Sequence, residues 1–118
     1  IFEDQLQDKK TVYVIGASRS VRDIMKYYIP HYTNKRIKLK VPLHMIYAGE
    51  RRDVPIKLTK IKYLSKEFGT LVSTNIYGDK VAIILWLEHD PVAILIKQPD
   101  VAKTFKNYFD MLWAMAKE

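Results

Sequence analysis

Two serines and an arginine follow the first apolar run of the sequence, and together they could bind an anion. Residues 11–15 (TVYVI) are mostly β-branched or aromatic, which is typical of a buried strand, and we expect Gly16 to end that strand. Ser18, Arg19 and Ser20 then precede a helix-like pattern. Free amides at a helix start favour negative charge, and a neighbouring cation adds to that preference. The spacing therefore predicts a site for an anionic effector at Ser18, Arg19 and Ser20.

The same stretch also fits a helix start without any ligand. Ser20 and Asp23 have the spacing of a capping box, in which the hydroxyl accepts from a free amide and the carboxylate reaches back. On this interpretation Arg19 and Arg22 are surface residues. Both interpretations remain open on the sequence alone.

Motifs for nucleotide binding and for serine hydrolysis are missing from this loop. A P-loop needs G-x-x-x-x-G-K-[ST] and a dinucleotide turn needs G-x-G-x-x-G, whereas the GASRSVRD stretch contains one glycine. Neither serine lies in the G-x-S-x-G turn of hydrolases. We therefore expect neither a bound nucleotide nor a serine nucleophile here.

Histidines and carboxylates form no metal-ligand pattern, and the chain has no cysteine. His89 lies between Glu88 and Asp90 in a predicted turn, where adjacent residues seldom converge on one ion. His44 alternates with apolar strand residues, which is typical of a surface or hydrogen-bonded imidazole. His31 is expected near the carboxyl end of a helix. We expect no metal and no cofactor.

The net charge of +7 is concentrated in the middle of the chain. Residues 35–66 contain ten lysines and arginines against Glu50 and Asp53, a local excess of +8, so the remainder sums to −1. Such a segment attracts anionic partners through its long-range field, and nucleic acid through counterion release. It is equally typical of a solvated lysine-rich surface. Tyr47 and Tyr63 are few aromatics for base stacking.

Length and composition suit one domain over residues 1–118 that can bury a core, since 48% of its residues are hydrophobic. No apolar run approaches the roughly 18 residues of a membrane span, so we expect no membrane association. The lack of cysteine fits a reducing, cytoplasmic location. We interpret residues 1–10 as the remnant of a connecting helix or linker.

Hydrophobic periodicity and turn residues predict six strands and two helices. A Gly78-Asp79 turn between apolar runs indicates a hairpin, and the run at 81–87 is apolar on both faces, as in a central strand. Pro30 is expected to end the first helix, and Pro42 to mark an edge or bulge. The predicted elements are strands at 11–15, 37–48, 60–64, 72–76, 80–87 and 92–96, the strand at 92–96 being buried, with helices at 21–29 and from Pro99 onward.

This order, β-α-β-β-β-β-β-α, predicts a mixed sheet of the α/β or α+β class with helices packed on it. It contains one early crossover, followed by strands that we expect to be linked as hairpins. The final helix has an apolar stripe that includes Phe105, Phe109, Leu112 and Trp113, so it must lie on the sheet.

The carboxyl-terminal half carries a family resemblance. NIYGDKVAIILW, followed by HDPVAILIKQPDVAKTFKNYFDMLWAMAK, resembles the effector domain of archaeal TrmB-like transcriptional regulators, including an F-x-x-L-W-x-x-A-like pattern at Phe109, Leu112, Trp113 and Ala116. The strand and turn at VYVIGASRS and the strand at IKYLS occupy comparable places, so the resemblance extends over most of the chain.

The resemblance implies a domain like half of a phospholipase D fold, which works as a cytoplasmic homodimer. It also implies DNA binding through a winged-helix domain outside this chain, and a small-molecule effector of unknown identity. Some relatives complete a sugar site with a further carboxyl-terminal domain, and no residue of that site is assigned here. The implied function is effector sensing or dimerisation in transcription regulation.

Phospholipase D chemistry needs the motif H-x-K-x-x-x-x-D, in which histidine attacks phosphorus and lysine neutralises charge. The three histidines are followed two residues later by Thr33, Ile46 and Pro91. We therefore expect a protein that is not an enzyme, with no catalytic residues. The alternatives are direct nucleic-acid binding through residues 35–66 and, less favoured, a degenerate phosphodiesterase.

Overall fold

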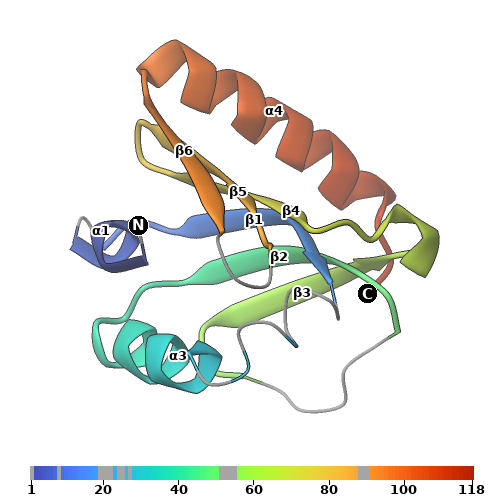
Figure 1. Cartoon of the computed structure of the whole chain (residues 1–118), viewed down its shortest axis with the longest axis horizontal. Helices are drawn as coiled ribbons and strands as arrows, with labels where there is room; N and C mark the ends of the chain where they lie inside the picture. The colour runs from blue at the N-terminus through green and yellow to red at the C-terminus, as the bar shows by residue number, and fades with distance from the viewer. Residues whose placement is uncertain are drawn as a thin grey trace.

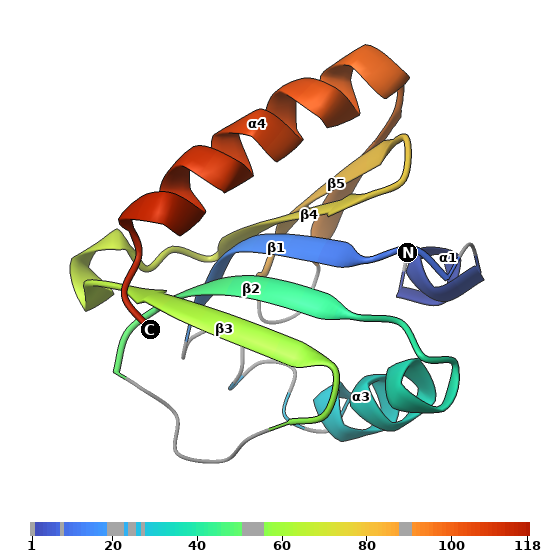
Figure 2. The same cartoon turned by 180° about the vertical axis from the view of Figure 1, so that it is seen from behind.

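A six-stranded mixed sheet lies at the centre of the computed structural model, which describes residues 2–7, 9–18, 23, 26, 28–50, 56–87 and 91–118 (Figures 1 and 2). Helices pack on both of its faces, so the predicted α+β class and the predicted order of strands and helices are confirmed. The strands are β1 (Val12–Ser18), β2 (Leu43–Ala48), β3 (Thr59–Leu64), β4 (Val72–Tyr77), β5 (Lys80–Leu85) and β6 (Val92–Lys97). The helices are α1 (Phe2–Gln7), α3 (Ile29–Lys38), the 3-10 turn η1 (Lys66–Phe68) and α4 (Pro99–Met115).

The strands lie in the order β3-β2-β1-β4-β5-β6. β1, β2 and β3 run parallel to one another, whereas β4, β5 and β6 form an antiparallel meander joined to β1 through β4. The predicted hairpin at Gly78 is confirmed, with Gly78 at φ +57°. The prediction that hairpins link all the later strands was wrong for β2 and β3, because parallel neighbours need a crossover.

The region around the first two prolines differs from its prediction. Pro30 lies in the first turn of α3, where its missing N–H costs no hydrogen bond, so it begins a helix instead of ending one. Residues 37–42 therefore belong to the end of α3 and its loop, and Pro42 precedes β2. The carbonyl of Pro42 accepts from the amide of Val12 at 3.0 Å. Most of the predicted helix at 21–29 lies outside the described residues.

Gly16 lies within β1, and our expectation that it ends the strand was wrong. The β1–β2 register shifts between Ile15 and Ala17, which identifies a bulge, and Gly16 has φ +92°. A Cβ atom on Gly16 would lie 2.5 Å from the carbonyl oxygen of Val72. Only glycine therefore fits this approach of β1 to β4.

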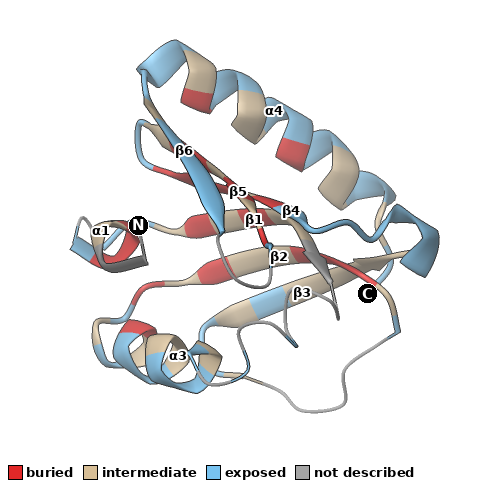
Figure 3. Ribbon diagram, viewed as in Figure 1, coloured by how far each residue is buried: buried red, intermediate tan, exposed pale blue. Residues whose placement is uncertain are grey.

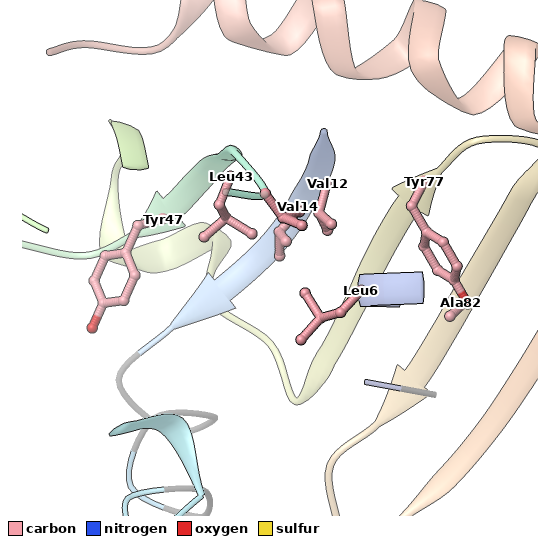
Figure 4. Packing of buried hydrophobic residues seen from close by; sticks show 8 residues of the cluster. Leu6, Val12, Val14, Leu43, Tyr47, Tyr77 and Ala82 are labelled. Atoms are coloured by element: carbon pink, nitrogen blue, oxygen red, sulfur yellow. The ribbon is translucent and has the colours of Figure 1, made fainter. Parts of the chain in front are cut away.

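Two apolar clusters hold the helices on the sheet. On one face, α1 and α3 cover an apolar cluster seen in Figure 4, in which Leu6 of α1 packs with strand residues: Val12, Val14, Leu43, Tyr47, Tyr77 and Ala82. On the other face α4 covers Ile46, Ile76 and Val81 with its own Ala102 and Phe109. The alternation of Val81 and Ala82 between the two clusters is the period of two that a strand requires.

Most predictions for the carboxyl-terminal strands and helix are confirmed. The side chain of Gln98 accepts from the amide of Asp100 at 2.9 Å, and Pro99 begins α4 as expected. β5 lies between β4 and β6 and is mostly buried. β6 was predicted to be buried, and this was wrong, because it is an edge strand that stays exposed over most of its length (Figure 3). Within the described ranges, no helix is long and apolar enough to cross a membrane.

Candidate functional site

The predicted anion site begins at the carboxyl end of β1. Ser18 is the last residue of that strand and lies opposite Ala48 in the register with β2. The side chain of Ser18, and the whole of Arg19 and Ser20, lie outside the described residues. The anion site at these three positions therefore stays a prediction.

The basic segment at 35–66 divides between the two faces of the sheet. Lys35 and Lys38 are exposed on α3, on the face covered by α1 and α3. Lys60 and Lys62 alternate with Ile61 and Tyr63 along β3, and so point to the face that carries α4. The described lysines of this segment do not form one continuous stripe.

Arg36 is removed from the charged surface altogether. Only 1% of it is exposed, and its guanidinium donates to the carbonyls of Val41 (2.9 Å) and Leu58 (3.1 Å) and to the hydroxyl of Thr59. Burial lowers the pKa of Arg36, but a guanidinium stays protonated at neutral pH. Arg36 thus joins the end of α3 to the start of β3, which is a structural role.

A basic-aromatic cluster forms where α4 crosses β1, β2 and β3. We define it by its six residues, which come from four elements: Tyr13, His44, Lys60, Lys62, Lys106 and Trp113. Tyr13 lies opposite His44 in the β1–β2 register, and His44 lies opposite Lys60 in the β2–β3 register, so these three form one cross-strand row. The helix adds Lys106 and Trp113 above this row.

Trp113 is the centre of the cluster. Its ring stacks on His44, with centroids 5.7 Å apart and planes at 21°, and on Phe109 at 5.4 Å and 23°. The ammonium of Lys62 lies 5.0 Å from the indole centroid and donates to the carbonyl oxygen of Trp113 at 3.1 Å. The positive charge of Lys62 near the carboxyl end of α4 also interacts favourably with the negative end of the helix dipole.

A second cation of the cluster, Lys106 of α4, lies over Tyr13 at the β1 end of the row. The ammonium of Lys106 is 4.3 Å from the centroid of Tyr13 and forms an ion pair with Asp110 one helical turn away. Tyr13 also meets His44 edge to face, with centroids 5.4 Å apart. Lys60 is thus the cross-strand neighbour of the imidazole, and Lys106 lies over the tyrosine ring that contacts it.

Burial lowers the pKa of His44, and the charges of Lys60 and Lys106 lower it further. The imidazole is consequently neutral at pH 7 and can donate one hydrogen bond and accept another. An anion beside it would meet the ammonium group of Lys60 and a neutral imidazole, with Lys62 and Lys106 further along the cluster, where they contact the carbonyl of Trp113 and the carboxylate of Asp110. The cluster thus has the charge to hold a phosphate or a carboxylate, while its stacked and half-buried rings leave little free face for a base.

The other histidines do not join the cluster. His31 lies in the first turn of α3, exposed, with its ring 6.0 Å from that of Tyr28, so the expectation that it ends a helix was wrong. His89 lies outside the described residues. In the part of the chain that the structure describes, no group of three histidine, aspartate or glutamate residues could hold a metal.

The aromatic half of the cluster could not be identified from the sequence. Tyr47 and Tyr63, the aromatic residues of the basic segment, pack against each other on the face of α1 and α3, with ring centroids 6.0 Å apart. Tyr13 and Trp113 instead come from the two ends of the chain. The apolar stripe of the last helix did identify Trp113 as a residue facing the sheet, but no spacing could pair it with Lys62.

No protein-family model matches this sequence, and no curated protein matches it. A solved structure with a similar fold is described as TrmBL2, an archaeal chromatin protein with a novel mode of DNA binding. The two share 13% sequence identity at a TM-score of 0.62, over 98% of this chain and 48% of that one. This chain therefore spans about half the length of the TrmBL2 chain. At this identity the similarity establishes a common fold.

Proposed function

We propose that this chain is a non-catalytic regulatory domain of a TrmB-like protein that associates with DNA. The observation that carries the proposal is the fold shared with TrmBL2 over 98% of the chain. The family resemblance of its carboxyl-terminal half supports the same conclusion. The domain joins two copies of the protein and responds to an anionic effector, while a winged-helix domain outside this chain binds the DNA.

The distribution of functional groups supports a role without catalysis. A domain like half of a phospholipase D fold would need histidine and lysine two positions apart on one strand. In β2 the residue two positions after His44 is Ile46, which is buried. The imidazole of His44 stacks on Trp113, and so it has a packing role in place of an attacking one.

DNA binding by the chain alone tests this proposal. Fluorescence anisotropy with a duplex of about 30 base pairs should show weak binding by the 118-residue chain at 150 mM salt, with a Kd above roughly 100 µM. The natural protein that carries the chain should bind the same duplex at least 100-fold more tightly. Tight binding by the chain alone, or hydrolysis of bis(p-nitrophenyl) phosphate with added Mg²⁺ or Zn²⁺, would contradict it.

The anionic effector is tested separately at Ser18, Arg19 and Ser20. Isothermal titration of the chain with inorganic phosphate and with sugar phosphates should give a saturable signal that Arg19→Gln removes. Lys38→Gln, which changes charge on α3, is the matched control. Identical titrations for wild type and Arg19→Gln would remove the effector site from the proposal and leave dimerisation.

The basic-aromatic cluster favours a second candidate, direct contact with the phosphates of nucleic acid. Lys60 belongs to the row of Tyr13 and His44, while Lys106 lies over Tyr13 and Lys62 over Trp113, so three cations gather on one face of the sheet. If the cluster contacts phosphates, Lys60→Gln should reduce the magnitude of the slope of log Kobs against log salt by about 0.9, because one phosphate contact is lost. Lys38→Gln should leave the slope unchanged. Equal slopes for the two variants would exclude the cluster as the contact.

A further inference from the structure

β6 is an exposed and apolar edge of the sheet. Within the described part of the chain its one sheet neighbour is β5. Val92 and Ile94 are 50% and 56% exposed on the face that carries α4, and Leu95 is 47% exposed on the opposite face. Figure 3 shows the strand pale blue along most of its length. Long apolar edges of this kind are templates for pairing with another strand.

The opposite edge of the same sheet is protected. β3 carries Lys60 and Lys62, and charged side chains on an edge discourage pairing. The carboxyl-terminal tail also covers it, since Tyr63 and Lys117 exchange two backbone hydrogen bonds of 2.6 and 2.9 Å. Over residues 92–96, β6 has neither charged side chains nor a covering segment. The β3 edge is therefore protected against pairing, whereas the β6 edge is open to it.

The register shows which backbone groups of β6 point outward. The amide of Gln98 donates to the carbonyl of Asp79 at 3.0 Å, which fixes these two as a hydrogen-bonded pair. Because hydrogen-bonded pairs alternate along the ladder, the backbone N–H and C=O groups of Ile96, Ile94 and Val92 also point toward β5. The N–H and C=O groups that face the open edge consequently belong to Ala93, Leu95 and Lys97.

α4 extends this apolar edge. Tyr108 and Met111 are exposed apolar residues of α4 on the side away from Lys106 and Trp113, which face β1, β2 and β3. They are 52% and 58% exposed. Half-exposed side chains of this size each show roughly 60–120 Å², so the five apolar residues offer on the order of 500 Å². A standard interface needs about 800 Å² per partner, and the strand backbone adds to the side-chain area.

We propose that a second copy of this chain pairs antiparallel with β6, with the two-fold axis at Leu95. This inference rests on the proposed dimerisation and names its interface. In this register Leu95 faces Leu95 of the partner subunit, and Ala93 faces the partner's Lys97, so all three outward residues find both of their hydrogen-bonding partners. Moving the two-fold axis by two residues to Lys97 would put the two Lys97 residues opposite each other, and moving it to Ala93 would put Leu95 opposite Pro91, which has no N–H.

The charge of the strand favours its own copy as the partner. The chain carries +7, so two copies repel each other except where their contact surface lacks charge. Residues 92–96 are uncharged, and the chosen register keeps the two Lys97 side chains apart. Two antiparallel edges also form an isologous contact that closes on itself, so assembly stops at the dimer.

Oligomeric state measures the interface directly. Sedimentation velocity of the wild-type chain from about 10 to 200 µM should show a dimer, and Leu95→Lys should raise its dissociation constant about 100-fold or more, because two like charges meet at the axis. Leu58→Lys is the matched control, since Leu58 is 44% exposed just before β3 at the far edge. Circular dichroism confirms that both variants fold.

A single cysteine tests the register, because the chain has none of its own. Hydrogen-bonded antiparallel pairs have Cα atoms about 5.5 Å apart, within the range of a disulfide. Leu95→Cys should therefore form a covalent dimer with oxidised glutathione, whereas Ala93→Cys should stay uncoupled alone and couple when mixed with Lys97→Cys. If the wild-type chain dimerises and Leu95→Lys does not weaken the dimer, the proposed β6 interface is wrong, but the proposed dimerisation stands. A wild-type monomer at 200 µM would overturn both.

Discussion

The indole of Trp113 stacks on the imidazole of His44, with ring centroids 5.7 Å apart and planes at 21°. This contact joins α4 to the middle of the parallel half of the sheet. It also holds the imidazole beside Lys60 and Lys106, where protonation is disfavoured. A packing contact and an electrostatic one thus depend on the same residue, and this gives the protein a measurable dependence on pH.

The free energy of unfolding should fall as the pH falls below 6.5. Burial and the two lysines lower the pKa of His44 from 6.5 in the folded chain, so the unfolded chain binds this proton more readily. The stabilisation is complete above pH 6.5 and is lost as the pH falls toward the folded pKa. Urea unfolding at several pH values between 7.5 and 5 measures it. His44→Phe keeps the stacking and should flatten the curve, whereas His31→Gln should not.

Gly16→Ala should destabilise the chain by about 2–4 kcal/mol, because it adds backbone strain at φ +92° and a clash with the carbonyl of Val72. Gly78→Ala is the matched control. Gly78 also has positive φ, but a Cβ there meets nothing nearer than the Lys10 side chain at 3.4 Å. Its cost should be about 1 kcal/mol, the strain alone. Equal losses in urea unfolding would show that the bulge tolerates a side chain.

Arg36→Lys should cost about 2–4 kcal/mol of stability. A guanidinium reaches the carbonyls of Val41 and Leu58 and the hydroxyl of Thr59 together, and an ammonium does not, so buried acceptors lose their partners. Lys38→Gln, an exposed change on the same helix, should stay within about 0.5 kcal/mol of wild type. Thermal unfolding followed by circular dichroism distinguishes the two. A tolerated Arg36→Lys would mean that charge alone is needed.

Local signals predicted the antiparallel half of the fold well. The Gly78 turn and the apolar runs beside it specify β4 and β5 within a few residues, and the stripe of α4 specifies its buried face. Pro30 was misinterpreted because the same residue suits either the first turn of a helix or the position just after one. The predicted burial of β6 was wrong because an apolar run does not show whether its strand lies at the centre or at the edge of the sheet.

The candidate site could be predicted only in part. The strand predicted at 60–64 is confirmed, and its alternation places Lys60 and Lys62 on one face of the sheet. Their aromatic neighbours could not be found, because Tyr13 and Trp113 reach the cluster through the sheet order and the path of α4. Arg36 was counted as part of a charged surface, since nothing in its spacing shows that three acceptors enclose it.

The contact of α1 with the β4–β5 hairpin should weaken in acid. Both carboxylate oxygens of Asp4 accept from the ammonium of Lys80 at 2.9 Å, and one also accepts from the hydroxyl of Tyr77 at 2.9 Å. The hydrogen bond from Lys80, and then that from Tyr77, lowers the pKa of Asp4 from 3.8. The stabilisation is therefore present above about pH 4 and is lost as the pH falls below it.

Asp4→Asn should remove this acid dependence at a cost of up to about 1 kcal/mol at pH 7, because solvent screens a partly exposed pair. Lys80→Gln should cost a similar amount, and the double variant should cost less than the sum, since both changes remove the same interaction. Hydrogen exchange of the α1 amides provides the local readout: either single variant should speed it, while amides of β5 stay slow. Fully additive losses would show that Asp4 and Lys80 do not interact in solution, and that α1 is held by Leu6 and the apolar cluster alone.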